Sequence, residues 1–136
     1  MYYMGIDIGA SSVKVAAVDA GCTVLRVIRR AHKGSPLPCL RAMLAELADG
    51  SADRSLPLSA QACGGVVATG SGADMLRALV PGLRALEEVP ALVKGVRALN
   101  PQAACIIGMG AQSGVFVTGI ADGVAPEFAM NESCAA

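Results

Sequence analysis

The stretch Gly5-Ile6-Asp7-Ile8-Gly9-Ala10-Ser11-Ser12-Val13-Lys14 decides the fold class of this chain. Residues 2–8 are mostly apolar and run into Gly9, which is typical of a buried central strand that ends in a tight turn. Backbone N–H groups and hydroxyls in such a turn can cradle phosphate oxygens, while the Asp7 carboxylate can hold Mg²⁺ through water. An ordinary Gly/Ser turn capped by Asp7 explains the same spacing equally well.

Two more glycine turns lie further along the chain. Thr69-Gly70-Ser71-Gly72 follows the apolar residues 64–69, and Gly108-Met109-Gly110-Ala111-Gln112-Ser113-Gly114 joins two apolar runs. Glycines let the backbone approach a ligand closely, and Gln112 could orient an attacking water. Each turn could equally be a loop without a ligand.

The pattern of apolar residues predicts an α/β order around these turns. A helix is expected to begin at Ser35-Pro36 and stop at Gly50, a short one to follow Gly72, and a third to run from Val89 to Asn100. Strands are expected at 2–8, 13–19, 22–29, 64–69, 104–109, 114–120 and 124–130. A meander of three antiparallel strands followed by βαβ crossovers predicts an α/β, ribonuclease-H-like lobe over 1–136, with a mixed sheet flanked by helices. The same lobe is found in the actin, Hsp70 and sugar-kinase superfamily.

Composition excludes several classes of partner. The chain has 136 residues, a formal net charge of zero and only 3% aromatic residues. It therefore lacks the basic surface and the stacking side chains that nucleic acid requires. No apolar run reaches the ~20 residues needed to cross a bilayer, and no secretory leader is apparent. We expect a soluble, cytoplasmic protein that binds neither nucleic acid nor membrane.

The five cysteines are widely scattered. No C-x-x-C pair occurs, so neither a zinc site nor a disulfide framework is predicted. We expect buried, apolar roles for four of them, namely Cys22, Cys39, Cys63 and Cys105. Cys134 differs because it stands among small residues in Met130-Asn131-Glu132-Ser133-Cys134-Ala135-Ala136. The one histidine, His32, is expected to be exposed.

Four blocks of sequence together resemble the BadF/BadG/BcrA/BcrD ATPase family. They are GIDIGASSVK at 5–14, ATGSGADML at 68–76, IIGMGAQSG at 106–114 and MNESCAA at 130–136. The family includes the activator of 2-hydroxyglutaryl-CoA dehydratase and subunits of benzoyl-CoA reductase. The last block is the most specific, since the family reads M-N-x-x-C-A-A-G-T-G there.

The resemblance implies a homodimer in which cysteines hold one [4Fe-4S] cluster between ATP-binding lobes. ATP hydrolysis, with Mg²⁺, would drive an electron to a 2-hydroxyacyl-CoA dehydratase or benzoyl-CoA reductase component. By position, Asp7 and Gln112 are the candidate catalytic residues and Cys134 the candidate cluster ligand. The candidate nucleotide-binding residues are Gly9, Ala10, Ser11, Ser12, Lys14, Gly70, Gly72, Gly108 and Gly110. The chain is then interpreted as one lobe of a longer protein, and the cluster is expected in that protein rather than in this stretch alone.

Two alternatives remain open from the sequence. Gly108, Ser113 and Val115 stand where the family has two acids and a lysine. A degenerate, non-hydrolysing actin-like module with a binding or structural role would fit that departure. The N-terminal lobe of a sugar or acetate kinase is the other alternative, although MNESCAA has no role there.

Overall fold

The computed structural model describes residues 1–51, 57–111, 113–120 and 126–131. The chain divides into two compact units, Met1–Leu86 and Glu87–Ala136. The sequence predicts a single lobe over 1–136. The boundary between the two units lies after the last strand of the first sheet and before the helix that precedes the second sheet.

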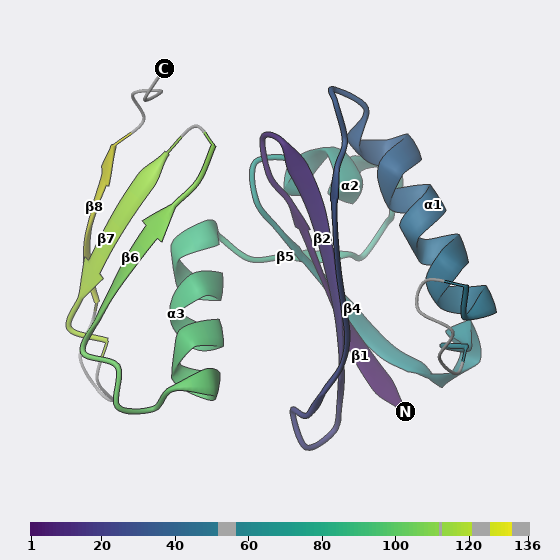
Figure 1. The fold of residues 1–136 in the computed structure, drawn as a ribbon, viewed down its shortest axis with the longest axis horizontal. Coiled ribbons are helices and arrows are strands. Elements are labelled where there is room, and N and C mark those ends of the chain that lie inside the picture. Colours follow the sequence, from purple (N-terminus) through teal and green to yellow (C-terminus); the bar gives the residue numbers. More distant parts are fainter. Residues whose placement is uncertain (52–56, 112, 121–125, 132–136) are drawn as a thin grey trace. The chain divides into compact units, whose positions relative to one another are not determined.

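The first unit is built on a five-stranded mixed sheet in the order β3-β2-β1-β4-β5 (Figure 1). Its strands are β1 (Tyr2–Ile8), β2 (Ser12–Asp19), β3 (Val24–Ala31), β4 (Cys63–Thr69) and β5 (Arg84–Ala85). The first three form an antiparallel meander, and β4 joins β1 in parallel. β5 in turn pairs with β4 in parallel. This arrangement confirms the predicted α/β fold class with its antiparallel three-strand meander.

Two helices cover one face of this sheet, α1 (Pro36–Asp49) and α2 (Ala73–Leu79). The side chains of β1 alternate between buried and accessible, because successive residues of a strand point to opposite faces. The buried set of β1 and β2 packs against both helices; it comprises Tyr2, Met4, Ile6, Ile8, Val13, Val15 and Ala17 on the sheet and Leu40, Met43, Leu47, Ala73 and Leu76 on the helices. Asp7 and Lys14 therefore lie on the opposite face.

Helix α1 begins and ends as the sequence predicts. Pro36 occupies the first turn, where its missing N–H costs nothing, and Gly50 ends the helix at φ 76°, a conformation that glycine adopts without strain. Ser35 precedes the helix, but its hydroxyl makes no capping hydrogen bond.

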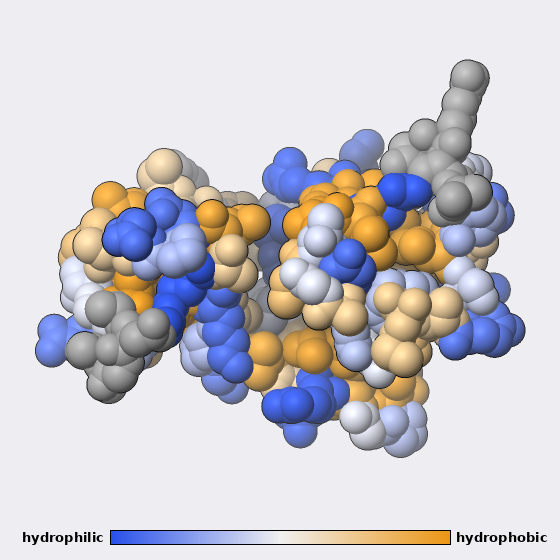
Figure 2. Space-filling view, turned by 90° about the horizontal axis from the view of Figure 1, so that it is seen from below, coloured by the Kyte–Doolittle hydropathy of each residue, from blue (hydrophilic) through white to orange (hydrophobic). Residues whose placement is uncertain are grey.

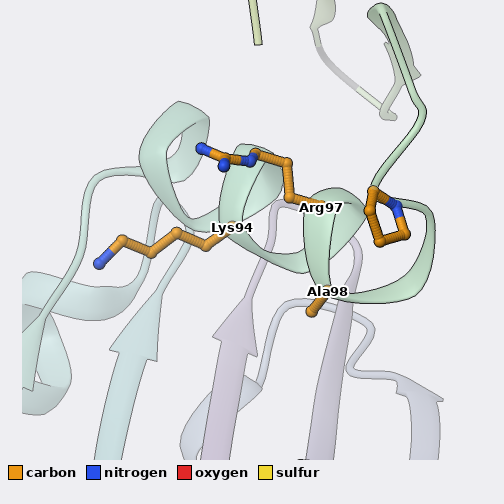
Figure 3. Close-up of a pocket in the computed structure, with 4 residues that line it drawn as sticks. Lys94, Arg97 and Ala98 are labelled. Carbon is orange, nitrogen blue, oxygen red and sulfur yellow. The ribbon is translucent and has the colours of Figure 1, made fainter. Parts of the chain in front are cut away.

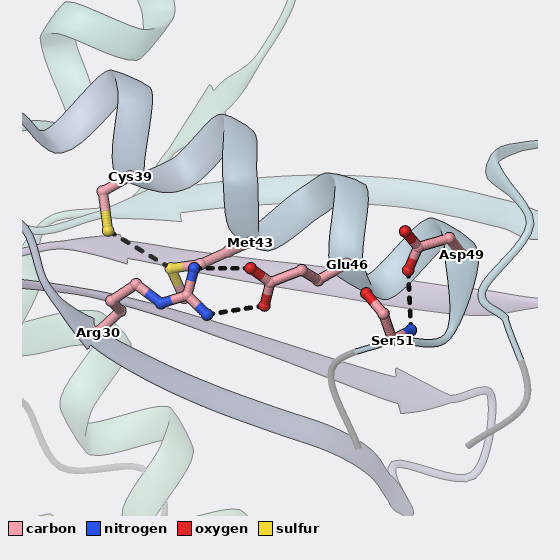
Figure 4. Close-up of polar contacts among 6 residues, drawn as sticks. All are labelled: Arg30, Cys39, Met43, Glu46, Asp49 and Ser51. Atoms are coloured by element: carbon pink, nitrogen blue, oxygen red, sulfur yellow. Dashed lines mark hydrogen bonds and ion pairs between the residues drawn. The ribbon is translucent and has the colours of Figure 1, made fainter. Parts of the chain in front are cut away.

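An ion pair fixes α1 to the edge strand β3 (Figure 4). Two guanidinium nitrogens of Arg30 donate to the two carboxylate oxygens of Glu46, at 2.8 and 2.7 Å. The Arg30 hydrogen bonds lower the pKa of the Glu46 carboxyl, and the same contact raises the pKa of Arg30. The Asp49 carboxylate accepts from the Ser51 N–H at 2.8 Å, and Ser51 lowers the pKa of Asp49.

The second unit contains α3 (Glu88–Leu99) and a separate antiparallel sheet in the order β6-β7-β8. Its strands are β6 (Cys105–Met109), β7 (Gly114–Thr118) and β8 (Glu127–Asn131). Val89 and Val93 of α3 share a buried cluster with Ile106, Val117 and Ile120. The sequence placed these strands in the mixed sheet, and it did not predict that they form a sheet of their own.

Three local details differ from the sequence prediction. β3 starts two residues later than expected, because the Asp19 carboxylate accepts from the N–H groups of both Gly21 and Thr23 and so widens the turn between the two strands. The short 3₁₀ helix η1 (Ala60–Ala62) and the two-residue strand β5 were not predicted. The connection between the expected strands 114–120 and 124–130 lies outside the described residues.

Apolar side chains also reach the surface of both units (Figure 2). The most exposed large ones include Met109, Leu99 and Ile107. None of the helices that the structure describes is long and apolar enough to cross a membrane.

Candidate functional site

A row of polar side chains crosses four strands on the face of the first sheet that lies opposite α1. Strand register aligns Arg29 of β3 with Lys14 of β2, Lys14 with Asp7 of β1, and Asp7 with Thr69 of β4. Residues that pair across strands project to the same face. Lys14 Nζ donates to Asp7 Oδ2 at 2.6 Å, and both side chains are partly accessible. The row thus joins a carboxylate, an ammonium and a hydroxyl.

The Thr69 hydroxyl lacks a hydrogen-bond partner among the described residues although its oxygen is buried. A buried hydroxyl left without a partner costs about 1–3 kcal/mol, so such groups commonly have a role or a bound partner. Its register partner is Asp7. A carboxylate and a hydroxyl on one face are oxygen ligands of the kind that Mg²⁺ takes.

The predicted first phosphate loop forms a closed four-residue turn between β1 and β2. The Gly9 N–H donates to the Ser12 carbonyl at 3.0 Å, and the strands pair again at Ile8 and Val13. Ala10 and Ser11 are exposed at the tip, while Ser12 is buried with 5% of its surface accessible. The tip residues can therefore meet a ligand, whereas Ser12 belongs to the base of the turn.

The predicted Thr69–Gly72 turn packs directly behind this loop. The Gly72 N–H donates to the Ile8 carbonyl at 2.9 Å. A Cβ on Gly70 would stand 2.5 Å from Asp7 Oδ1 and 2.6 Å from the Ile8 carbonyl oxygen, and Gly70 has a φ of +87°. A Cβ on Gly72 would stand 2.3 Å from Ile8 Cγ2. Glycine is needed at both positions, so the two predicted turns are one structural unit.

His32 also belongs to this site, which corrects the expectation that it is exposed. It is half-buried just after β3, and its Nε2 lies 3.1 Å from the Gly9 carbonyl oxygen. The Gly34 N–H donates to its Nδ1 at 3.1 Å. No local pattern in the sequence predicts this contact, because 23 residues separate His32 from Gly9.

The predicted second phosphate loop closes in the same way in the second unit. The Gly110 N–H donates to the Ser113 carbonyl at 2.8 Å. Gly108 pairs with Val115, and a Cβ on Gly108 would stand 2.8 Å from Val115 Cγ1 and 3.5 Å from Leu92 Cδ2. Gln112, the second candidate catalytic residue, lies outside the described residues.

The cysteines only partly follow the sequence prediction. Cys22 and Cys105 are exposed, and Cys39 and Cys63 are half-buried. The expectation of four buried cysteines is therefore wrong; Cys22, for example, sits in a turn at φ 63°. Within the described ranges, no three Cys, His, Asp or Glu side chains gather to hold a metal ion. Cys134, the candidate cluster ligand, lies outside those ranges.

The cavities of the described residues include two that lie away from the glycine loops. One of about 440 Å³ is lined by apolar side chains of β1, α1 and α2, among them Met4, Leu40 and Leu76, on the helical side of the sheet. The other, of about 340 Å³, is lined by Lys94, Arg97, Ala98 and Pro101 on the surface around the end of α3 (Figure 3). Neither includes Asp7, so the polar row remains the candidate site.

The chain shares its fold with several solved structures, among them two dehydratase activator proteins and an exopolyphosphatase. Among solved structures, component A of the Acidaminococcus fermentans (R)-2-hydroxyglutaryl-CoA dehydratase superimposes with a TM-score of 0.81 at 20% identity, over the whole of this chain and 49% of that one. The activator of the 2-hydroxyisocaproyl-CoA dehydratase from Clostridium difficile, solved with bound ADPNP, gives a TM-score of 0.76 at 24% identity, over the whole of this chain and 47% of that one. An exopolyphosphatase from Cytophaga hutchinsonii gives 0.62 at 15% identity, over 97% of this chain and 50% of that one.

The resemblance to the dehydratase activators that the sequence indicates is thus confirmed at the level of the fold. The chain spans about half the length of these structures. No protein-family model and no curated protein sequence matches the chain.

Proposed function

We propose that the chain is the ATP-binding lobe of an activator for a 2-hydroxyacyl-CoA dehydratase or a benzoyl-CoA reductase type of enzyme. The observation that carries the proposal is the polar row at the end of β1, where Asp7, Lys14 and the unpartnered Thr69 hydroxyl lie beside the Gly9 turn. The likeness in fold to an activator solved with ADPNP supports a nucleotide as the ligand.

Different residues of the site bind the phosphates and the Mg²⁺ of Mg²⁺-ATP. The N–H groups and hydroxyls at the tip of the Gly9 turn bind phosphate oxygens, and Lys14 neutralises their charge. Asp7, directly or through water, and the Thr69 hydroxyl hold Mg²⁺, which prefers oxygen ligands and keeps several waters. Bound Mg²⁺ neutralises charge that develops on the phosphates.

We further propose that Cys134 contributes to a [4Fe-4S] cluster shared by two copies, from which an electron passes to the partner enzyme. This part of the proposal rests on the MNESCAA sequence at 130–136 alone. Clusters of this type ordinarily take four cysteine ligands, so two copies would need ligands besides the Cys134 pair. The cytoplasmic location expected from the sequence also stays a prediction.

The nucleotide proposal is tested by calorimetric titration of the chain with Mg²⁺ and ADPNP. Asp7→Asn should weaken binding by about 10- to 100-fold, since a hydrogen bond or ligand contact to a charged group is worth about 1.5–3 kcal/mol. Glu46→Gln is the matched control, because it removes the same charge from the same unit on the opposite side of the sheet. Equal affinities of the wild type and Asp7→Asn would remove Asp7 from the site.

The cluster proposal has a separate test. Iron and sulfide content and visible absorption are measured after anaerobic reconstitution of the longer protein that the resemblance implies, as wild type, Cys134→Ser and Cys105→Ser. We expect Cys134→Ser to abolish the absorption. Cys105→Ser, which replaces an exposed cysteine of β6, should leave it unchanged. Iron content that is the same in all three proteins would contradict the proposal.

A further inference from the structure

His32 is held between two backbone groups just beyond the end of β3. Its ring nitrogen Nε2 lies 3.1 Å from the Gly9 carbonyl oxygen, and its Nδ1 accepts the Gly34 N–H at 3.1 Å. The main chain is also fixed here, since the His32 N–H donates to the Ser11 carbonyl at 3.1 Å. The imidazole thus ties the turn after β3 to the first phosphate loop.

These two contacts define the direction of each hydrogen bond. A backbone N–H can only donate, so Nδ1 must carry a lone pair toward Gly34. In the neutral ring the proton then sits on Nε2, and Nε2–H donates to the Gly9 carbonyl. The contact with Gly9 is therefore a hydrogen bond from the side chain to the loop.

The bond to Gly9 also sets the direction of the next amide. The described chain has no cis peptide bond, and in a trans peptide the C=O and the following N–H point in opposite directions. Because the Gly9 C=O points at His32, the Ala10 N–H points away from it. If this peptide turned over, the carbonyl oxygen would point where the N–H now points, and it would repel a phosphate.

We propose that His32 is a positioning residue of the first phosphate loop: by holding the Gly9 carbonyl, it presents the Ala10 N–H to a phosphate oxygen of the nucleotide. The inference rests on the proposed function and adds to it a residue from a distant part of the chain. His32 itself does not touch the ligand. It acts through the orientation of one peptide plane.

Two conservative variants separate this role from a merely structural one. In His32→Asn, the amide oxygen takes the place of Nδ1 and can keep the Gly34 bond, but the side chain is too short to reach Gly9. In His32→Gln, the amide nitrogen takes the place of Nε2 and can keep the Gly9 bond. Lys33→Asn is the control, because it removes the neighbouring charge, leaves both ring contacts and suits the φ of 48° at that position.

Two measurements are made on each protein: the carbonyl carbon-13 chemical shift of Gly9 without ligand, and the affinity for Mg²⁺-ADPNP. We expect His32→Asn to move the Gly9 shift upfield and to weaken ADPNP binding about tenfold. His32→Gln and Lys33→Asn should stay within about twofold of the wild type. Similar melting temperatures of the Asn and Gln variants would show that unfolding is not the cause.

The outcomes are distinct. If the Asn and Gln variants lose affinity equally, or neither loses it, the positioning role is overturned. If the wild type itself does not bind ADPNP, the proposed function fails instead, and a Gly9 shift that moves only in His32→Asn still shows that His32 holds this peptide. A Gly9 shift that does not move in His32→Asn overturns the inference whatever the affinity.

Discussion

In the β1–β2 hairpin and in the β6–β7 hairpin, four residues separate the last paired residues, Ile8–Val13 in the first and Met109–Gly114 in the second. Both turns begin with Gly-Ala and end with a serine whose carbonyl accepts the glycine N–H, at 3.0 Å in one and 2.8 Å in the other. The next residue pair away from the turn differs between the two hairpins. The first has Asp7 opposite Lys14, and the second has Gly108 opposite Val115.

The surroundings of that residue pair differ as much as the side chains. Asp7 and Lys14 lie on the face away from α1 and remain partly accessible. Val115 packs with the buried cluster under α3, and the space beside Gly108 is bounded by Val115 and Leu92. The same turn geometry therefore occurs beside a charged site in the first hairpin and beside apolar packing in the second. The two hairpins differ in the charge at one register position, and not in the turn.

The largest expected effect concerns the Thr69–Gly72 turn, which packs against the first hairpin. In Gly70→Ala, the new Cβ would meet Asp7 Oδ1 and the Ile8 carbonyl oxygen at 2.5 and 2.6 Å, at a φ of +87°. Strained backbone and overpacking each cost about 1–3 kcal/mol, so we expect a loss of about 4 kcal/mol in the free energy of unfolding. Urea denaturation followed by circular dichroism measures it.

The control for Gly70→Ala is a glycine with room around it. Gly95 lies inside α3, and a Cβ there would have nothing within 4 Å. Gly95→Ala should raise the stability by about 0.5–1 kcal/mol, because alanine loses less backbone freedom in a helix. A Gly70→Ala protein as stable as the wild type would mean that the Thr69–Gly72 turn does not support the Asp7 end of β1.

The second prediction introduces an aspartate into the second hairpin, at the position that corresponds to Asp7 of the first. Gly108→Asp should lower the free energy of unfolding by about 2–3 kcal/mol, because the Cβ would stand 2.8 Å from Val115 Cγ1 and the carboxylate would enter an apolar layer. Urea denaturation at neutral pH checks it. Gly110→Ala is the comparison, since its Cβ would meet the Ser113 carbonyl at the milder distance of 3.1 Å. An unchanged stability of Gly108→Asp would show that the second hairpin can hold a charge as the first does.

Much of the fold could be predicted from the sequence because its signals are local. The apolar run of residues 2–8, proline at the start of α1 and Gly50 at its end each act within a few residues, and the structure confirms them. The two glycine turns after β1 and after β6 were predicted for the same reason. The strand that follows Asp19 was misplaced because the Asp19 carboxylate bonds two N–H groups of the turn, a choice that residue types alone do not settle.

The rest of the site depends on contacts between distant residues. Thr69 becomes a neighbour of Asp7 only through the parallel pairing of β4 with β1. His32 meets Gly9 only because β3 returns alongside β2 and ends there. The division of the strands into two sheets depends on which edges pair, and the hydrophobic pattern of a strand carries no such information. Periodicity could therefore predict the elements, but not the partners that complete the site.

The smallest expected effect concerns α1, the longer of the two helices on the first sheet. α1 is held by the Arg30–Glu46 ion pair in addition to its apolar contacts. The Arg30 hydrogen bonds lower the folded-state pKa of Glu46 from its ordinary value of 4.5, so the pair stabilises the fold above about pH 4.5, and this stabilisation is lost as the pH falls through the lowered pKa. Both side chains are partly accessible, so the change in stability should be small and weaker at high salt.

Urea midpoints measured from pH 7 to pH 3 should decline less steeply in Glu46→Gln and in Arg30→Gln than in the wild type. The double variant should resemble each single one, since either substitution already breaks the pair. Parallel declines in all four proteins would mean that the ion pair does not help to hold α1 to its sheet.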